Sequence, residues 1–225
     1  MKTVYIRSQD ESVQLICERD PMMKKLITVV GDIEIPLRTD YLASIVRSIV
    51  GQQISVSAAR AIYGRLEELL DGKITAEGLR AKTKEELRLV GLTQRKADYV
   101  KDLAEKVASK ELDLNNITQY TDEAIIEQLV NVKGIGNWTA EMFLILSLGR
   151  EDVLAVDDVG IQRAAKWLYE VDKTERRKIL IEKSPIWKPY RSIVTYYLWE
   201  AIHLGLVTDY ESIDEALLKK KIPFE

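Results

Sequence analysis

The sequence predicts an all-α protein, and three observations lead to this fold class. Apolar residues recur at helical spacing through nearly the whole chain after residue 8, whereas the alternation typical of strands is scarce. Capping residues precede many of these apolar stripes, and glycines follow many of them. The chain has 225 residues, of which 46% are hydrophobic, so it can fill a core without disulfides as one larger domain or two small lobes.

Helix boundaries in the first 130 residues follow from cap residues and glycines. The predicted starts are Ser8, Asp20, Tyr41, Ser55, Thr83, Thr93 and Thr121. The corresponding ends are placed at about Glu18, Gly31, Gly51, Leu69, Gly91, Leu103 and Val130. Pro36 interrupts residues 33–37, so we expect a connector there.

The second half of the chain continues the helical pattern. Residues 129–149 predict a helix, a short turn and a second helix that ends at Gly149. Later helix starts are predicted at Asp157 or Asp158, at Thr174 and at Pro189, with ends at Tyr169, about Glu182 and Gly205. The helix that begins at Pro189 is expected to be the last of the chain.

Composition excludes several classes of protein. One cysteine, Cys17, and one histidine, His203, cannot supply an intramolecular disulfide, a four-thiolate cluster or a histidine-rich metal site. The net charge of −3 removes the simplest argument for a nucleic-acid partner, so only local patches could bind one. The first residues lack the apolar core of a signal peptide, and no stretch approaches about 18 consecutive apolar residues. We therefore expect a cytoplasmic protein that does not span a membrane.

The turn at residues 132–136 has a composition suited to binding a phosphate. Gly134 and Gly136 permit positive φ angles and leave the backbone bare directly before a helix N-terminus, where amide N–H groups can converge on an anion. The alternative is that the glycines only end one helix and lead into the next. Ile135 between the glycines, followed by Trp138 and Thr139, favours the phosphate-binding interpretation, because the whole string resembles a helix-hairpin-helix motif.

Four blocks in order extend this resemblance to a family. They are IVRSIVGQQISVSAA at 45–59, LVGLTQRKADYV at 89–100, LVNVKGIGNWTA at 129–140 with VLAVDDVGIQR at 153–163, and WKPYRSIVTYYLW at 187–199. With these blocks the chain resembles the helix-hairpin-helix, glycine/proline-rich, aspartate superfamily of DNA glycosylases, in its alkylpurine (3-methyladenine type II) branch. The resemblance implies a two-lobed helical fold with the active site in the cleft between the lobes. A central lobe of about residues 40–150 would be inserted in a lobe formed by residues 1–39 and 151–225.

The activity that the resemblance implies is DNA repair by base excision. Such an enzyme flips an alkylated purine, such as 3-methyladenine or 7-methylguanine, out of double-stranded DNA and hydrolyses its glycosidic bond, leaving an abasic site. The resemblance also implies a monomer that is nucleoid-associated in a prokaryotic cell. Two alternatives stay open: a mismatch or oxidised-base glycosylase of the same fold, and a helix-hairpin-helix module that binds DNA without catalysis.

Asp158 matches the position of the family's catalytic aspartate. Asp157 is the rival, and for either carboxylate the alternative role is a helix N-cap. Breaking an N-glycosidic bond builds positive charge on the sugar, which a nearby carboxylate stabilises. At about 4 Å and an effective dielectric constant near 20, that attraction is about 4 kcal/mol, or roughly a thousandfold in rate.

The resemblance also implies a monofunctional enzyme without a cofactor or metal. Bifunctional relatives place a lysine nucleophile just after the second hairpin glycine, where this chain has Trp138. Lys133 precedes the glycines and does not replace that nucleophile by motif. No cysteine follows Cys17, so the iron–sulfur cluster of several relatives has no ligands here.

The remaining site residues are expected to hold the flipped base or the DNA. Trp138 and Trp199 match the pocket tryptophans of the alkylpurine branch, and their faces attract cationic alkylated purines. The full base pocket is expected to comprise Trp138, Trp199, Tyr190 and Met142. Gln53 matches the residue that fills the gap left by the flipped base. The expected DNA contacts are Gln52, Gln53, Arg95, Lys96, Lys133, Gly134, Ile135, Gly136 and Thr139.

Overall fold

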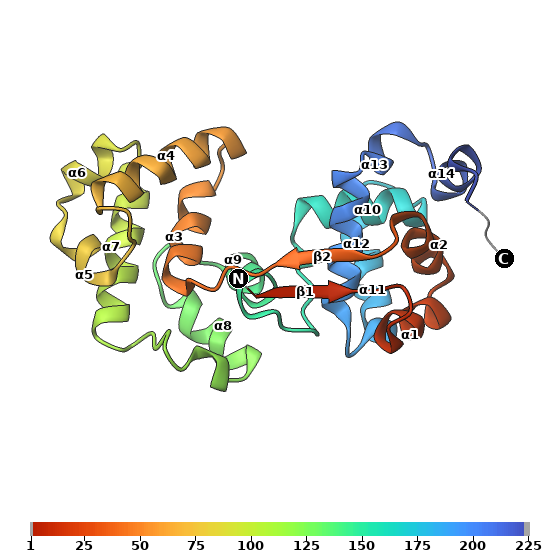
Figure 1. Cartoon of the computed structure of the whole chain (residues 1–225), viewed down its shortest axis with the longest axis horizontal. Helices are drawn as coiled ribbons and strands as arrows, with labels where there is room; N and C mark the ends of the chain where they lie inside the picture. Colours follow the sequence, from red (N-terminus) through yellow and green to blue (C-terminus); the bar gives the residue numbers. More distant parts are fainter. Residues whose placement is uncertain (1, 223–225) are drawn as a thin grey trace. The chain divides into compact units, whose positions relative to one another are not determined.

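The computed structural model describes residues 2–222, and it folds into two compact units (Figure 1). Unit 1 is continuous and runs from Arg38 to Leu148. Unit 2 combines Lys2–Leu37 with the chain from Gly149 onward. The chain thus leaves unit 2 near residue 37 and re-enters it near residue 149.

Unit 1 is built of helices alone within its described residues. They are α3 (Tyr41–Gly51), α4 (Val56–Leu69), α5 (Ala76–Ala81), α6 (Lys84–Leu89), α7 (Gln94–Ala108), the 3-10 turn η1 (Ile117–Gln119), α8 (Asp122–Val130), α9 (Asn137–Phe143) and the π-helical turn η2 (Leu144–Leu148). The predicted caps Ser55, Thr93 and Thr121 each accept a backbone N–H three residues ahead. Thr83 and Glu86 form the predicted capping box.

Helix α7 is central to unit 1 and packs against α3, α5 and α6. Its buried face carries Ala97, Val100, Leu103 and Ala104 at helical spacing. Complete burial of such a face stabilises the fold by about 25 cal/mol for each Å² of apolar surface removed from water. Two polar side chains of α7 also contact turns of unit 1. Lys96 binds the turn between α3 and α4, and Asp102 binds the turn before α9.

Unit 2 contains the remaining helices and one small sheet. Its elements are β1 (Thr3–Ile6), α1 (Glu11–Arg19), α2 (Pro21–Val30), β2 (Ile33–Pro36), α10 (Val159–Tyr169), α11 (Arg176–Trp187), α12 (Arg191–His203), α13 (Leu206–Asp209) and α14 (Ile213–Lys220). Helix α12 packs against α2, α10 and α11. Its residues 192–198 are all buried, which explains why it lacks a clear polar face.

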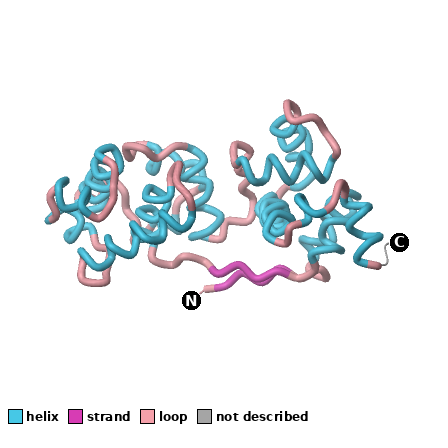
Figure 2. Tube along the Cα trace, turned by 90° about the horizontal axis from the view of Figure 1, so that it is seen from above, coloured by secondary structure: helices cyan, strands magenta, loops and turns pink. Residues whose placement is uncertain are grey.

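The two strands are the main departure from an entirely helical chain. β1 pairs with β2 in antiparallel register, with Thr3 opposite Pro36 and Ile6 opposite Ile33, and Figure 2 shows them as one magenta ribbon. The prediction of a connector at residues 33–37 was therefore wrong. Pro36 at the outer end of an edge strand is compatible with pairing, because its missing N–H is not needed there. The fold remains predominantly helical, as predicted.

Several predicted helix boundaries in unit 2 also need correction. Asp10, not Ser8, precedes the first helix, since its carbonyl accepts the first helical N–H groups, those of Val13 and Gln14. Helix α11 continues through Pro185 to Trp187, beyond the predicted end at Glu182. Pro189 follows a cis peptide bond, and α12 begins two residues later. Two short helices, α13 and α14, follow the predicted last helix.

A buried carboxylate joins three helices of unit 2. Asp20 is fully buried and caps α2, as predicted, by accepting from the backbone N–H groups of Met22 and Met23. Its other oxygen accepts from the Tyr169 hydroxyl at 2.8 Å and from the Trp187 indole at 3.0 Å. The end of α10 and the end of α11 are thereby fixed to the start of α2. Among the described residues, none of the helices has the length and apolar character needed to cross a membrane.

Candidate functional site

Asp158 lies at the N-terminus of α10, where it has two hydrogen-bond donors on one oxygen. Its Oδ1 accepts the backbone N–H of Ile161 at 2.9 Å, which is an N-cap bond, and the indole N–H of Trp199 at 3.3 Å. The residue is half-buried. The cap bond orients the Asp158 carboxylate at the positive end of the helix dipole. Asp158 can therefore cap the helix and keep a charged carboxylate for chemistry.

Trp199 approaches Asp158 from α12. Its ring packs edge to face against Tyr196, with the ring centroids 6.1 Å apart. Tyr196 is buried, and this burial raises the pKa of its hydroxyl. Trp199 is thus fixed by an aromatic neighbour on one side and bonded to a carboxylate through its N–H group.

Asp157 has different surroundings from its neighbour. Its exposed carboxylate pairs with Arg177, whose Nε lies 2.7 Å from Oδ1, and this pairing raises the pKa of the guanidinium. Between the two aspartates, Asp158 is therefore the one that is bound to an aromatic side chain. Asp158 is also the residue of the pair that caps α10.

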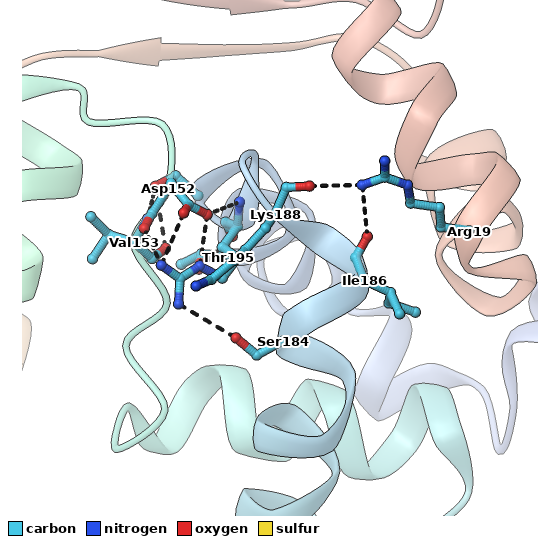
Figure 3. Close-up of polar contacts among 9 residues, drawn as sticks. Arg19, Asp152, Val153, Ser184, Ile186, Lys188 and Thr195 are labelled. Atoms are coloured by element: carbon cyan, nitrogen blue, oxygen red, sulfur yellow. Dashed lines mark hydrogen bonds and ion pairs between the residues drawn. The ribbon is translucent and has the colours of Figure 1, made fainter.

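The segment before Asp158 is held by α12 and by a glutamine of α10. Arg191 binds Asp152 in a bidentate manner, with Nε to Oδ1 at 2.7 Å and a terminal nitrogen to Oδ2 at 3.0 Å (Figure 3). The Ser192 hydroxyl accepts the N–H of Val153 at 3.0 Å. Gln162 donates its amide to the carbonyl of Val156 at 2.7 Å. These bonds fix the backbone on which Asp158 is carried.

The start of α12 is supported in turn by α1. The guanidinium of Arg19 donates to the carbonyl oxygens of Ile186 and Lys188 at 3.3 and 2.7 Å, as Figure 3 shows. These carbonyls lie at the end of α11, where helical partners are missing. The loop that precedes Tyr190 is thereby held in place.

The glycine turn of unit 1 requires glycine at one of its two positions. Gly134 has a φ of +79°, and a Cβ there would lie 2.1 Å from the ring of Tyr99. Gly136 has a φ of −105°, and a Cβ there would meet nothing within 4 Å. Ile135, between them, is buried and anchors the turn. Gly134 is needed for the shape of the turn, whereas Gly136 leaves an open backbone surface at the N-terminus of α9.

One acidic side chain, that of Asp102, contacts this turn. The Asp102 carboxylate accepts the backbone N–H of Lys133 at 2.9 Å and lies 3.4 Å from its ammonium. Lys133 is exposed, so this pair is screened by solvent and leaves the lysine accessible.

The corner between α3 and α4 presents Gln53. This residue is exposed and has a φ of 58°, which is uncommon for a residue with a side chain. Its neighbour Gln52 points back and donates its amide to the carbonyl of Gly134 at 2.9 Å. Of the two glutamines, Gln53 is therefore presented to solvent and Gln52 joins the corner to the glycine turn.

The structure changes the assignment of some predicted contacts. Lys96 is buried and donates to the carbonyls of Val50 and Gln52, each at 2.8 Å, so its ammonium is not presented to solvent as a phosphate contact requires. Arg95, the preceding residue, is exposed. The side chains of Ile135 and Thr139 are buried as well, so only their backbone groups could meet a phosphate.

The predicted base-pocket residues differ in exposure. Trp138 is 40% exposed on α9, whereas Met142 on the same helix is buried. Tyr190 is half-buried at the start of α12 and lines a cavity of about 270 Å³ in unit 2 that Tyr196 also borders. Trp187 is fully buried. Trp138 belongs to unit 1, and Trp199 and Tyr190 belong to unit 2.

Three residues of the site were not predicted from the sequence. Tyr99 and Asp102 contact the glycine turn from α7, and Gly160 lies so close to Asp158 that a Cβ would be 2.9 Å from Oδ1. Their contacts span elements that are distant in sequence or depend on a short approach of backbone, and no local pattern indicates either. No group of three His, Cys, Asp or Glu side chains in the described part of the chain could hold a metal ion.

Comparison with known proteins identifies relatives that are DNA repair proteins. Residues 46–189 match the family of HhH-GPD superfamily base excision DNA repair proteins. The chain is 32% identical over 193 residues to DNA-3-methyladenine glycosylase 1 of Schizosaccharomyces pombe, covering 83% of this chain and 84% of that protein.

Two solved structures resemble the whole fold. A DNA-3-methyladenine glycosidase from Bacillus halodurans has a TM-score of 0.86 and 38% identity, over 96% of this chain and 99% of that one. The 3-methyladenine DNA glycosylase of Schizosaccharomyces pombe, solved in complex with abasic DNA, has a TM-score of 0.78 and 29% identity, over 89% of this chain and 99% of that one.

Proposed function

The chain belongs to the HhH-GPD superfamily of base excision DNA repair proteins, and from this membership we propose that it is a DNA glycosylase that excises alkylated purines from double-stranded DNA. The observation that carries the proposal is the carboxylate of Asp158, oriented by the Ile161 N–H and the Trp199 indole. The similarity to 3-methyladenine glycosylases over most of both chains supports the class of substrate.

The proposed reaction is hydrolysis of the N-glycosidic bond. The bond between the sugar and the base breaks, and its electron pair leaves with the base. A cationic alkylated purine is a good leaving group because it departs as a neutral molecule. The sugar gains positive charge, which the Asp158 carboxylate stabilises, and a water molecule adds to the anomeric carbon while losing a proton. The products are a free base and an abasic site.

Aromatic side chains supply the selectivity for alkylated purines in this proposal. The indole of Trp199, which is bonded to Asp158, offers a π face to a flipped base, and a cationic purine gains about 0.5 to 2 kcal/mol from a good contact of this kind. Trp138 is exposed enough to receive a ring on its face. A neutral oxidised purine gains none of this attraction.

We propose that the enzyme is monofunctional and acts as a monomer. Trp138 stands where a nucleophilic lysine would form a Schiff base, and the ammonium of Lys133 lies beside Asp102. Borohydride trapping on duplexes that contain one lesion tests this point. We expect free base and an intact strand after mild work-up, and a covalent adduct at catalytic yield would contradict the monofunctional assignment.

Phosphate contacts by the glycine turn account for DNA binding despite the net charge of −3. Backbone N–H groups at the N-terminus of α9 and the exposed side chains of Lys133 and Arg95 supply local positive potential. The affinity should therefore fall as salt concentration rises, because phosphate neutralisation releases counterions. An affinity that is independent of salt would argue against this mode of binding.

One excision assay tests the proposed function as a whole. Duplexes with a single 3-methyladenine, 7-methylguanine, hypoxanthine or 8-oxoguanine are incubated with excess protein, and released bases are quantified beside an undamaged duplex. We expect release of the methylated purines and little or none of 8-oxoguanine. Release of 8-oxoguanine alone would establish the oxidised-base activity instead, and specific binding without any release would indicate a non-catalytic module.

A further inference from the structure

Two exposed turns of unit 1 are attached to the same part of α7. The first is the α3–α4 corner, defined as residues 51–55, and the second is the glycine turn, residues 132–136. They are 77 residues apart in sequence, counting from the end of the corner at 55 to the start of the turn at 132. Three side chains on consecutive turns of α7, Lys96, Tyr99 and Asp102, make the attachments.

Lys96 holds the α3–α4 corner. Its ammonium donates to the carbonyls of Val50 and Gln52, which lie at the C-terminal end of α3 and lack helical donors. A cation at this end also interacts favourably with the helix dipole. Burial lowers the pKa of Lys96, because desolvation disfavours its charged form. The contact thus fixes the backbone on both sides of Gly51, directly before Gln53.

Tyr99 and Asp102 hold the glycine turn. The Tyr99 ring fills the space beside Gly134 so closely that no Cβ would fit. One helical turn further along, the Asp102 carboxylate accepts the N–H of Lys133. Gln52 completes the connection, because its side-chain amide donates to the carbonyl of Gly134 and so joins the corner directly to the turn.

We propose that Lys96, Tyr99 and Gln52 are positioning residues that fix the spacing between the α3–α4 corner and the glycine turn, so that Gln53 enters the duplex in register with the phosphate that the turn holds. This inference rests on the proposed function for the DNA contact of the glycine turn, and on the gap-filling role that the family resemblance implies for Gln53. Gln53 has the geometry that the inference needs. It is exposed within the α3–α4 corner on a backbone with a φ of 58°, and it directly follows Gln52, whose carbonyl and side-chain amide are both hydrogen-bonded.

A purely structural role makes a different prediction, and α7 provides a matched control. Lys101 donates to the carbonyls of Arg80 and Lys82 at 2.6 and 2.8 Å, at the end of α5 and at its C-cap. It is therefore a lysine of the same helix with the same kind of contact, but it touches neither turn. Lys96→Met and Lys101→Met should lower the melting temperature to a similar extent.

The experiment is a double-mutant cycle between Lys96 and Gln53. Wild type, Lys96→Met, Gln53→Ala, the double variant and Lys101→Met are compared by thermal melts and by titration of two duplexes. One duplex is undamaged. The other has a stable abasic-site analogue with 2-aminopurine opposite it, whose fluorescence reports insertion of a side chain into the gap without requiring excision.

We expect Lys96→Met and Gln53→Ala each to weaken the insertion response about tenfold, with affinity for undamaged duplex within about threefold of wild type. The insertion response of the double variant should be at most about twofold weaker than that of either single variant, because each change alone already prevents insertion of the Gln53 side chain. Lys101→Met should keep the wild-type response. Gln52→Ala, which removes only the bond to Gly134, supplies the same cycle if Lys96→Met does not fold.

Two results would overturn the inference. In the first, the fold-loss of the insertion response in the double variant equals the product of the fold-losses in the two single variants. In the second, Lys96→Met and Lys101→Met give the same insertion response. Failure of the proposed function is separate and visible, since it would appear as wild-type protein that shows the 2-aminopurine response but releases no alkylated base.

Discussion

The indole N–H of Trp199 donates to Oδ1 of Asp158 at 3.3 Å, so an aromatic side chain and a carboxylate of unit 2 are joined directly. The same oxygen accepts the cap bond from Ile161. In the proposed reaction Trp199 has two tasks. Its ring offers a π face to the base, and its N–H orients the Asp158 carboxylate that faces the sugar. The link can be tested by removing its parts one at a time.

Trp199→Phe removes the indole N–H and keeps an aromatic face. A hydrogen bond to a charged group contributes about 1.5 to 3 kcal/mol, and a half-exposed bond of 3.3 Å belongs at the lower end of that range. We expect single-turnover excision to fall about tenfold, with unchanged affinity for undamaged duplex. Trp187→Phe is unsuitable as a control because it would break the bond to buried Asp20. Excision by Trp199→Phe at the wild-type rate would show that the bond does not matter.

Asp158→Asn separates capping from catalysis. Asparagine caps helices about as well as aspartate, so the melting temperature should change little, whereas the charge that stabilises the sugar cation is lost. We expect excision to fall a hundredfold or more in single-turnover measurements, with binding of lesion DNA retained. Asp157→Asn removes only an exposed pair with Arg177 and should leave the rate within about threefold of wild type. A dead Asp157→Asn beside an active Asp158→Asn would reverse the assignment.

The parts of the fold that the sequence predicted depend on local chemistry. The Thr83–Glu86 capping box and the Asp20 cap before Pro21 both occur as predicted, because each is satisfied within four residues of the cap. The antiparallel ribbon was missed because its strands are only four residues long and bury few side chains. The first helix begins at Glu11, not directly after Ser8, and the Ser8 N–H binds Asp32, which is distant in sequence.

The site shows the same division between local and distant interactions. The caps at the N-terminus of α10 and the glycine turn were visible in the sequence because their residues are close together along the chain. Lys96 was predicted to contact phosphate because a basic residue at a helix start is usually exposed. Its actual carbonyl partners at Val50 and Gln52 are 46 and 44 residues away, and tertiary packing alone determines that contact.

Gly134→Ala and Gly136→Ala should have different effects, although both glycines belong to one motif. At Gly134 a side chain meets the Tyr99 ring on a backbone with positive φ, so we expect a loss of about 2 to 4 kcal/mol in the free energy of unfolding. Gly136→Ala should leave the melting temperature nearly unchanged, because the space around it is open. It should still weaken binding to all duplexes alike, by about tenfold, if a phosphate approaches the bare backbone there. Fluorescence anisotropy at two salt concentrations measures this, and full affinity in a folded Gly136→Ala would mean that the phosphate lies elsewhere.

Gly160→Ala tests whether the position of the Asp158 carboxylate, apart from its charge, determines the rate. The added Cβ would lie 2.9 Å from Oδ1, closer than Cβ atoms are found to oxygen, so the carboxylate has to move away from its present bonds. Alanine is favoured over glycine in a helix by about 0.8 to 1.0 kcal/mol, which offsets part of the crowding and should keep the protein folded. We expect single-turnover excision to fall by about ten- to a hundredfold at nearly constant DNA affinity, since misplacement of a catalytic group by about 1 Å has costs of that order. Gly64→Ala is the matched control, because Gly64 is a helical glycine of α4 where an added Cβ would meet nothing within 4 Å, and it should raise stability without changing the rate. Equal excision rates for Gly160→Ala and Gly64→Ala would show that Asp158 tolerates displacement, and the oriented carboxylate would then not explain the activity.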